Sequence, residues 1–210
     1  MKVANARIVF FLAVLLWIPA TARPQTISFG LNAGIPLSGL IETSDGETAT
    51  TGPYTFGPSI RIRLPRGFSL DAGLLYKRFA FGLTSNPERA AVQRLELPVL
   101  LRHDLSGSPI HPWVHAGISF NRVIAVGADV CARNSLGELT YCIAGETAAE
   151  LRHRHTHGPA LGAGFEFKWA GFRVAPEMRL TRWVDRNFGT RDSALRSHLT
   201  QVEVLLGLQF

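Results

Sequence analysis

The sequence is poor in cysteine, has a single long apolar run and contains no dense basic tract. Beyond the first 22 residues, 20 Lys and Arg face 16 Asp and Glu, and the cations are spread along the chain. Nucleic-acid binding requires basic side chains gathered on one face, so the composition gives no support for a nucleic-acid partner. No G-x-S-x-G elbow or comparable motif marks a nucleophilic serine. The sequence therefore says more about architecture and location than about catalysis.

The one long apolar run stands at the N-terminus. Lys2 and Arg7 precede IVFFLAVLLWI, a run of 11 apolar residues that Pro19 ends. A transmembrane helix needs about 20 apolar residues, so a membrane anchor is the weaker alternative. Ala20-Thr21-Ala22 supplies the small residues that precede a signal-peptidase site. We expect residues 1–22 to be a signal peptide, cleaved between Ala22 and Arg23, and residues 23–210 to form one exported domain.

Beyond the N-terminal run, apolar residues alternate with polar or small ones instead of recurring with a helical period. The last ten residues, QVEVLLGLQF, are typical, since every second side chain from Val202 to Phe210 is apolar. A period of two predicts β-strands. The pattern predicts eight strands, at 26–35, 54–64, 68–76, 94–103, 112–123, 158–169, 172–183 and 201–210.

The connections between these strands alternate in length. Short joins are expected at 65–67, 104–111 and 169–171. Long polar connections are expected at 36–53, 80–93, 124–157 and 184–198. Short turns on one rim and long loops on the other are typical of an outer-membrane barrel. The sequence therefore predicts an all-β fold, an eight-stranded antiparallel up-and-down transmembrane β-barrel.

Which face of the strands points outward separates this fold from a secreted, soluble, lipocalin-like ligand-binding barrel, in which the apolar face lines the interior. The polar faces here are rich in glycine and carry charges of both signs, such as Arg61, Asp71 and Glu96. Small residues suit the cramped interior of a narrow barrel, where opposite charges can pair. We therefore expect the apolar face to meet lipid.

Four prolines lie inside the predicted strands: Pro58, Pro98, Pro159 and Pro176. Each removes a backbone donor from the hydrogen-bond ladder, and a closed barrel has no free edge to accommodate it. We expect them to mark bulges or strand ends near a rim.

Several aromatic residues fall near the ends of the predicted strands. Trp113, Trp169 and Trp183, with Tyr54 and Tyr76, are placed there by the sequence. Girdles of aromatic residues flank the apolar band of outer-membrane barrels. We expect these five in such girdles, with packing in a soluble core as the alternative.

RLELPVLLRH (94–103) resembles the Leu-Glu-Ile-Pro-Leu-Leu-Leu-Lys signature in the middle strand of PorT-like and related OmpA-type outer-membrane β-barrels. HPWVHAGISF (111–120) resembles the strand that follows it there. The resemblance implies an eight-stranded outer-membrane barrel with its long loops outside. It also implies that Phe210, the terminal aromatic, is the C-terminal signal for the barrel-insertion machinery, and it implies no catalytic residues. The 124–157 loop is longer than the family suggests.

Cys131 and Cys142 are the two cysteines, and both follow the expected export signal. In an oxidising compartment such a pair is expected to form a disulfide, which would add about 2–3 kcal/mol in the chain-entropy model. The alternative is two free buried thiols.

Three histidines, His153, His155 and His157, are spaced two apart. On a strand they would share one face, where imidazoles could bind a transition metal. Arg152 and Arg154 stand between them and no acidic residue or cysteine nearby completes a ligand set, so a polar rim is the alternative. No cofactor is expected.

An acyl hydrolase acting on lipid A is an enzymatic alternative. It would need a serine, a histidine and an acid in hydrogen-bond reach at the outer rim. Ser197 and His157 or His198, with Glu150 or Asp185 as the acid, are the residues expected near that rim.

A large aqueous channel is not expected, because eight strands enclose only enough room for side chains; a small or gated passage stays open as an alternative. The hypothesis is therefore a non-catalytic outer-membrane protein that acts in envelope integrity, surface interaction or secretion through its long loops. Its expected partners are outer-membrane lipid and lipopolysaccharide, the insertion machinery, and a surface or secretion-system protein.

Overall fold

A computed structural model describes residues 27–38, 41–43, 50–83, 86–105, 110–133, 139–145, 151–169, 171–188 and 195–210. Within these ranges no helix has the length and apolarity to cross a membrane. A short 3-10 turn, η1 (Pro65–Gly67), joins two strands. The strands are β1 (Ile27–Pro36), β2 (Ile41–Thr43), β3 (Thr50–Arg63), β4 (Phe68–Gly73), β5 (Leu75–Leu83), β6 (Asn86–Asp104), β7 (His111–Arg133), β8 (Leu139–Gly145), β9 (His155–Trp169), β10 (Phe172–Arg182), β11 (Leu195–Ser197) and β12 (Thr200–Gln209).

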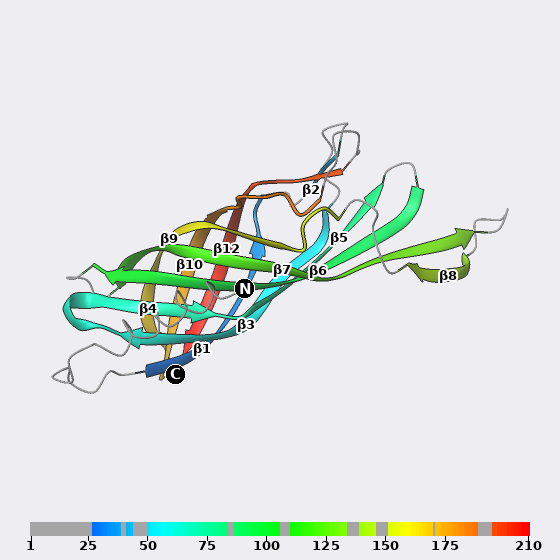
Figure 1. The fold of residues 1–210 in the computed structure, drawn as a ribbon. Coiled ribbons are helices and arrows are strands. Elements are labelled where there is room, and N and C mark those ends of the chain that lie inside the picture. The colour runs from blue at the N-terminus through cyan, green and yellow to red at the C-terminus, as the bar shows by residue number, and fades with distance from the viewer. Residues whose placement is uncertain are drawn as a thin grey trace, which may run out of the picture.

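The strands form a closed antiparallel barrel (Figure 1). β4 and β5 together make one wall, because both pair with β3 on one side and β6 on the other. The walls then run in chain order through β7, β9 and β10 to β12, and β12 pairs with β1 to close the cylinder. The predicted eight-stranded up-and-down barrel is confirmed.

Burial follows the period of two, and the apolar face points outward. Buried inward positions are mostly polar or charged, including Lys77, Glu96, Ser119 and Glu203. The exposed outward positions include Phe29, Leu31, Phe56, Leu97, Leu101, Ile118, Phe120, Leu161, Met178 and Leu206. A lipocalin-like barrel needs the opposite arrangement, so that alternative is wrong.

The wall on one side of the barrel is taller than the sequence pattern indicates. β6 and β7 extend through parts of 80–93 and 124–157, which were expected to be loops, and β8 pairs with the end of β7. The β6–β7 register shifts between Gln93 and Arg94, where Ile124 is the extra residue on β7. Such a bulge reverses which side chains point inward, and this loss of alternation hides the continuation of the strand from sequence analysis.

The expected long connections at 36–53 and 184–198 also contain strand. β2 pairs with β11 in a separate two-stranded sheet, with Glu42 opposite Arg196 in the register. β3 begins at Thr50, and its register against β5 shifts between Thr51 and Tyr54. Gly52 adopts a φ of +56° at this shift, a conformation that glycine adopts without strain.

The prolines do not mark register shifts in the described strands, contrary to expectation. Leu74, which separates β4 from β5, donates its backbone N–H to Pro58 on β3. On the other side of that wall, β6 pairs with β4 as far as Val99 and with β5 from Glu96 onward. The two residues of β6 between these ladders include Pro98. Since neither proline offers a backbone N–H, the wall is interrupted between two positions that lack ladder donors.

The two prolines near the C-terminal half behave differently. Pro159 lies inside β9, where it pairs with Ile118 of β7, next to the last β9–β10 register pair, Ala160 with Thr181; it therefore does not mark a strand end. Pro176 lies in the middle of β10, where the β9–β10 ladder lacks register pairs for two residues but keeps its register.

The outward apolar face predicts a depth-dependent response to a charge. Met178, in the middle of β10, and Val184, two residues past its end, are both 57% exposed. We expect Met178→Arg to lower the free energy of unfolding in lipid vesicles by about 2–4 kcal/mol, and Val184→Arg by about 0–1 kcal/mol, because the cost falls toward the interface. Urea titration in vesicles measures both, and equal losses would contradict the placement of the barrel in lipid.

Candidate functional site: the barrel interior and its two ends

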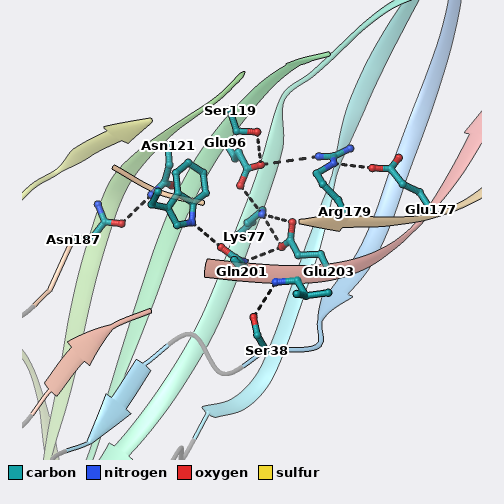
Figure 2. Close-up of polar contacts among 12 residues, drawn as sticks. Ser38, Lys77, Glu96, Ser119, Asn121, Glu177, Arg179, Asn187, Gln201 and Glu203 are labelled. Atoms are coloured by element: carbon teal, nitrogen blue, oxygen red, sulfur yellow. Dashed lines mark hydrogen bonds and ion pairs between the residues drawn. The ribbon is translucent and has the colours of Figure 1, made fainter. Parts of the chain in front are cut away.

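A buried lysine lies at the centre of the barrel interior (Figure 2). The Lys77 ammonium on β5 is 2.5 Å from Glu96 Oε2 on β6 and 2.6 Å from Glu203 Oε1 on β12. Gln201 donates a hydrogen bond of 3.0 Å to Glu203, and Ser119 donates one of 3.1 Å to Glu96. The contacts connect strands on opposite sides of the cylinder, so they brace the wall from within.

Arg179 on β10 continues this network (Figure 2). Its Nε donates to Glu177 Oε1 at 2.7 Å, and its Nη1 lies 4.0 Å from Glu96 Oε1. His115 Nε2 on β7 is 3.5 Å from the same Glu177 oxygen. Glu96 therefore joins the Lys77 cluster to the Arg179 cluster in one continuous set of charges.

A second ionic cluster lies toward the short-turn end. Arg61 on β3 contacts Asp71 Oδ1 at 2.9 Å through Nε and Glu166 Oε2 at 2.6 Å through Nη1. Arg102 on β6 donates to the same Glu166 oxygen at 3.1 Å. Its guanidinium carbon lies 4.3 Å from the centroid of the Trp113 ring, a cation–π contact.

Glycines on β9 make room for the largest of these inward side chains. A Cβ at Gly162 would lie 2.1 Å from His115 Nε2, and one at Gly164 would lie 2.5 Å from the Trp113 ring. Such distances are far below van der Waals contact, so a larger residue would displace the imidazole or the indole. The predicted role of glycine in a crowded interior is confirmed here.

The interior is closely filled. A cavity of about 30 Å³ is lined by Asn32, Arg61, Asp71, His115 and Glu177 among others, which is room for about one or two waters. Within the described part of the chain, the buried cations Arg61, Lys77, Arg94, Arg102 and Arg179 face the inward carboxylates of Asp71, Glu96, Glu166, Glu177 and Glu203. This packing favours mechanical support over conduction.

The interior also contains residues that the sequence analysis missed. Lys77 was not assigned to a strand, because the predicted strand stopped at residue 76, although the alternation continues through Lys77 to the buried Phe79. Trp113 and Trp183 were expected in interfacial girdles, but both are buried, and Trp183 Nε1 donates to Gln201 at 3.2 Å.

The remaining aromatic residues of that expectation point outward. Tyr54 and Tyr76 lie with Phe56 in a cluster whose ring centroids are 5.4–6.3 Å apart. Trp169, at the short-turn end of β9, is 69% exposed. Their outward direction is compatible with a girdle, which stays a prediction for these three residues.

The three candidate histidines do not all lie on one strand. His155 and His157 both point outward on β9, where His157 stacks with Phe120 at a centroid distance of 6.4 Å. His153 precedes the strand, and its carbonyl accepts a hydrogen bond from Asn187. Among the described residues no group of three or more His, Cys, Asp or Glu is arranged to hold a metal ion.

The described candidates for a hydrolase do not form a serine–histidine–acid hydrogen-bond chain. The Ser197 hydroxyl exchanges hydrogen bonds with the backbone of Phe188, at 3.3 Å and 3.4 Å, and no imidazole among the described residues contacts it. His198 and Asp185 are exposed. Glu150 lies outside the described residues.

The other predicted residues are placed as follows. Cys131 on β7 and Cys142 on β8 are register partners, and their side chains lie outside the described part of the structure. Phe210 is exposed, packs edge-on against Phe172 at a centroid distance of 5.6 Å, and donates its N–H to the Phe29 carbonyl. The signal peptide, with Ala22 and Arg23, lies outside the described residues.

No protein-family model matches the chain, and no curated protein matches it by sequence. Several solved structures are similar. Neisserial surface protein A has a TM-score of 0.51 and 13% identity, with 87% of this chain and 95% of that chain covered. The fold is that of an outer-membrane β-barrel. The outer membrane protein OprG from Pseudomonas aeruginosa has a TM-score of 0.51 and 11% identity, with 88% of this chain and 94% of that chain covered. Ail, the attachment invasion locus protein of Yersinia pestis, has a TM-score of 0.50 and 9% identity, with 90% of this chain and 100% of that chain covered.

Removal of the central lysine should leave two buried carboxylates without their cation. We expect Lys77→Met to lower the free energy of unfolding in vesicles by about 3–5 kcal/mol. The triple variant Lys77→Met, Glu96→Gln, Glu203→Gln should recover part of this loss. Arg78→Met removes the next cation along β5, which is exposed, and serves as the control with little effect. If Lys77→Met costs no more than Arg78→Met, the network does not stabilise the barrel.

Proposed function

We propose that this chain is an outer-membrane protein of a Gram-negative-type envelope with a non-catalytic, surface-interaction role. The observation that carries this proposal is the tall wall, defined as β5, β6, β7 and β8. β7 pairs with β9 only as far as Arg122 and then continues to Arg133. Eleven further residues of strand reach about 35 Å, and Figure 1 draws this hairpin projecting from the barrel.

The direction of the projection supports a surface role. It lies at the end of the barrel opposite to η1 and to the short join after β9. Short turns of outer-membrane barrels face the periplasm and long connections face outward. The tall wall would therefore present backbone and side chains beyond the lipid, while the filled interior holds it in place.

Export and insertion are part of the same proposal. Residues 1–22 would direct secretion, and Phe210 would be read by the insertion machinery. The outward position of Phe210 beside Phe172 supports a lipid-facing end of β12. Lipid and lipopolysaccharide would surround the apolar face. The PorT-like resemblance and a secretion-associated role remain predictions.

The surface role is tested by shortening the tall wall. Ala128 and Gly145 are register partners, so replacing residues 129–144 with Asn-Gly should leave a tight hairpin. We expect wild-type protein to cofractionate with outer membranes and to bind ligands on glycan and cell-surface-protein arrays. The shortened variant should still cofractionate with outer membranes but should lose the binding on the arrays. Arg66→Ala, at the opposite end, is the control.

Two outcomes would contradict the proposal. If the shortened variant still binds on the arrays, the tall wall does not carry the surface interaction. A difference in gel mobility between boiled and unboiled variant shows that the variant is folded in this test. A change of lipid A acyl chains on expression, detected by mass spectrometry, would instead favour the hydrolase alternative.

A disulfide between Cys131 and Cys142 would strengthen the hairpin of the tall wall. Their positions as direct partners across β7 and β8 support it, since bridged cysteines need Cα atoms about 4.4–6.8 Å apart. We expect neither thiol in exported protein to react with an alkylating reagent until a reductant is added. Cys131→Ser should then leave Cys142 reactive without reductant. Alkylation of both thiols in unreduced wild-type protein would overturn the disulfide.

A further inference from the structure

The short-turn mouth of the barrel contains a pocket of about 360 Å³, within the size range of small-ligand sites. Its charged lining comes from four strands of the barrel wall. Arg63 ends β3, Arg102 lies on β6, Lys168 on β9 and Arg173 on β10. His111 and the apolar side chains of Leu64, Phe68 and Phe167 complete much of the wall.

Among the residues that the structure describes, two carboxylates line this pocket, and both already accept hydrogen bonds. Asp104 Oδ1 accepts a hydrogen bond from Arg102 Nε at 2.6 Å. Glu166 Oε2 accepts from Arg102 and from Arg61, and Glu166 Oε1 lies 3.7 Å from Arg173 Nη1. The inward charges deeper in the barrel are balanced, whereas those at the mouth are not.

The excess positive charge has no partner in the described part of the chain. Neither Arg63 nor Lys168 has a carboxylate within ion-pair distance there. The Arg102 side chain is 1% exposed and adds positive charge from beneath the surface of the pocket.

We infer that this mouth pocket binds a small molecule carrying two or more carboxylate or phosphate groups. Arg102 contributes positive charge within the wall of the pocket, where Trp113, Asp104 and Glu166 hold its guanidinium in place. Arg63, Lys168 and Arg173 supply charge from three different strands around it. Guanidinium groups suit both anions, since they donate two parallel hydrogen bonds to either.

The compartment of this ligand rests on the proposed function. With the short turns in the periplasm, the pocket opens to periplasmic solutes, and the tall wall faces the other way. The pocket itself requires only the folded barrel, so its chemistry is testable independently of location.

The test is calorimetric titration of the full-length folded barrel in a non-ionic detergent. Pyrophosphate probes phosphate, tricarballylate probes carboxylate, and glucose is the uncharged control. We expect saturable binding of at least one anion and none of glucose. Arg63→Gln with Lys168→Gln should weaken it by about tenfold or more, because two charge-assisted contacts are lost. These residues make no ion pair among the described residues, so the barrel should fold normally.

The matched control is Arg152→Gln with Arg154→Gln. It removes the same charge from two exposed residues that precede β9 at the opposite end and should leave anion binding unchanged. Equal weakening by both pairs, or no saturation by either anion at roughly 10 mM, would overturn the pocket. Which anion binds distinguishes the two chemical sources. If the protein binds an anion but does not cofractionate with outer membranes, the result contradicts the proposed function and leaves the anion pocket standing.

Discussion

The ion pairs of Lys77 with Glu96 and Glu203 are the constraint on which the barrel depends. With the apolar face of the walls turned outward, the interior combines a few buried apolar residues, such as Leu75, Phe79 and Leu205, with many charged ones. The charged side chains need partners of opposite sign, because their surroundings are poor in water. The network ties the paired strands β5 and β6 to β12, which pairs with β1 and β10 on the other side of the barrel, so it fixes the diameter as well as the closure.

The same crowding explains why large inward residues and glycines occur together. His115 and Trp113 on β7 lie over Gly162 and Gly164 on β9, their near neighbours across the register. In this narrow barrel Trp113 and His115 each take up space that a glycine of β9 leaves open. Filling, pairing and glycine placement are therefore one arrangement of the described interior.

Period-two alternation was enough to predict the eight walls, their order and the outward apolar face. It failed where the alternation itself changes. The bulge at Ile124 reverses the inward side of β7, so the upper half of that strand resembled a loop in the sequence. Trp113 and Trp183 were misplaced because an aromatic near a strand end serves a girdle or an interior equally well. The mouth pocket depends on which four rim residues meet around a circle, and the sequence pattern does not contain that information.

The interruption at Leu74 gives the third wall two separately anchored halves. β4 is held in place by the Arg61–Asp71 pair across to β3, and β5 by Lys77 reaching into the interior. The registers of β4 and β5 against β3 and β6 are the same on both sides of the break, and Leu74 donates its N–H to Pro58 across it. The two charge pairs therefore fix the alignment of a single wall at two separate heights.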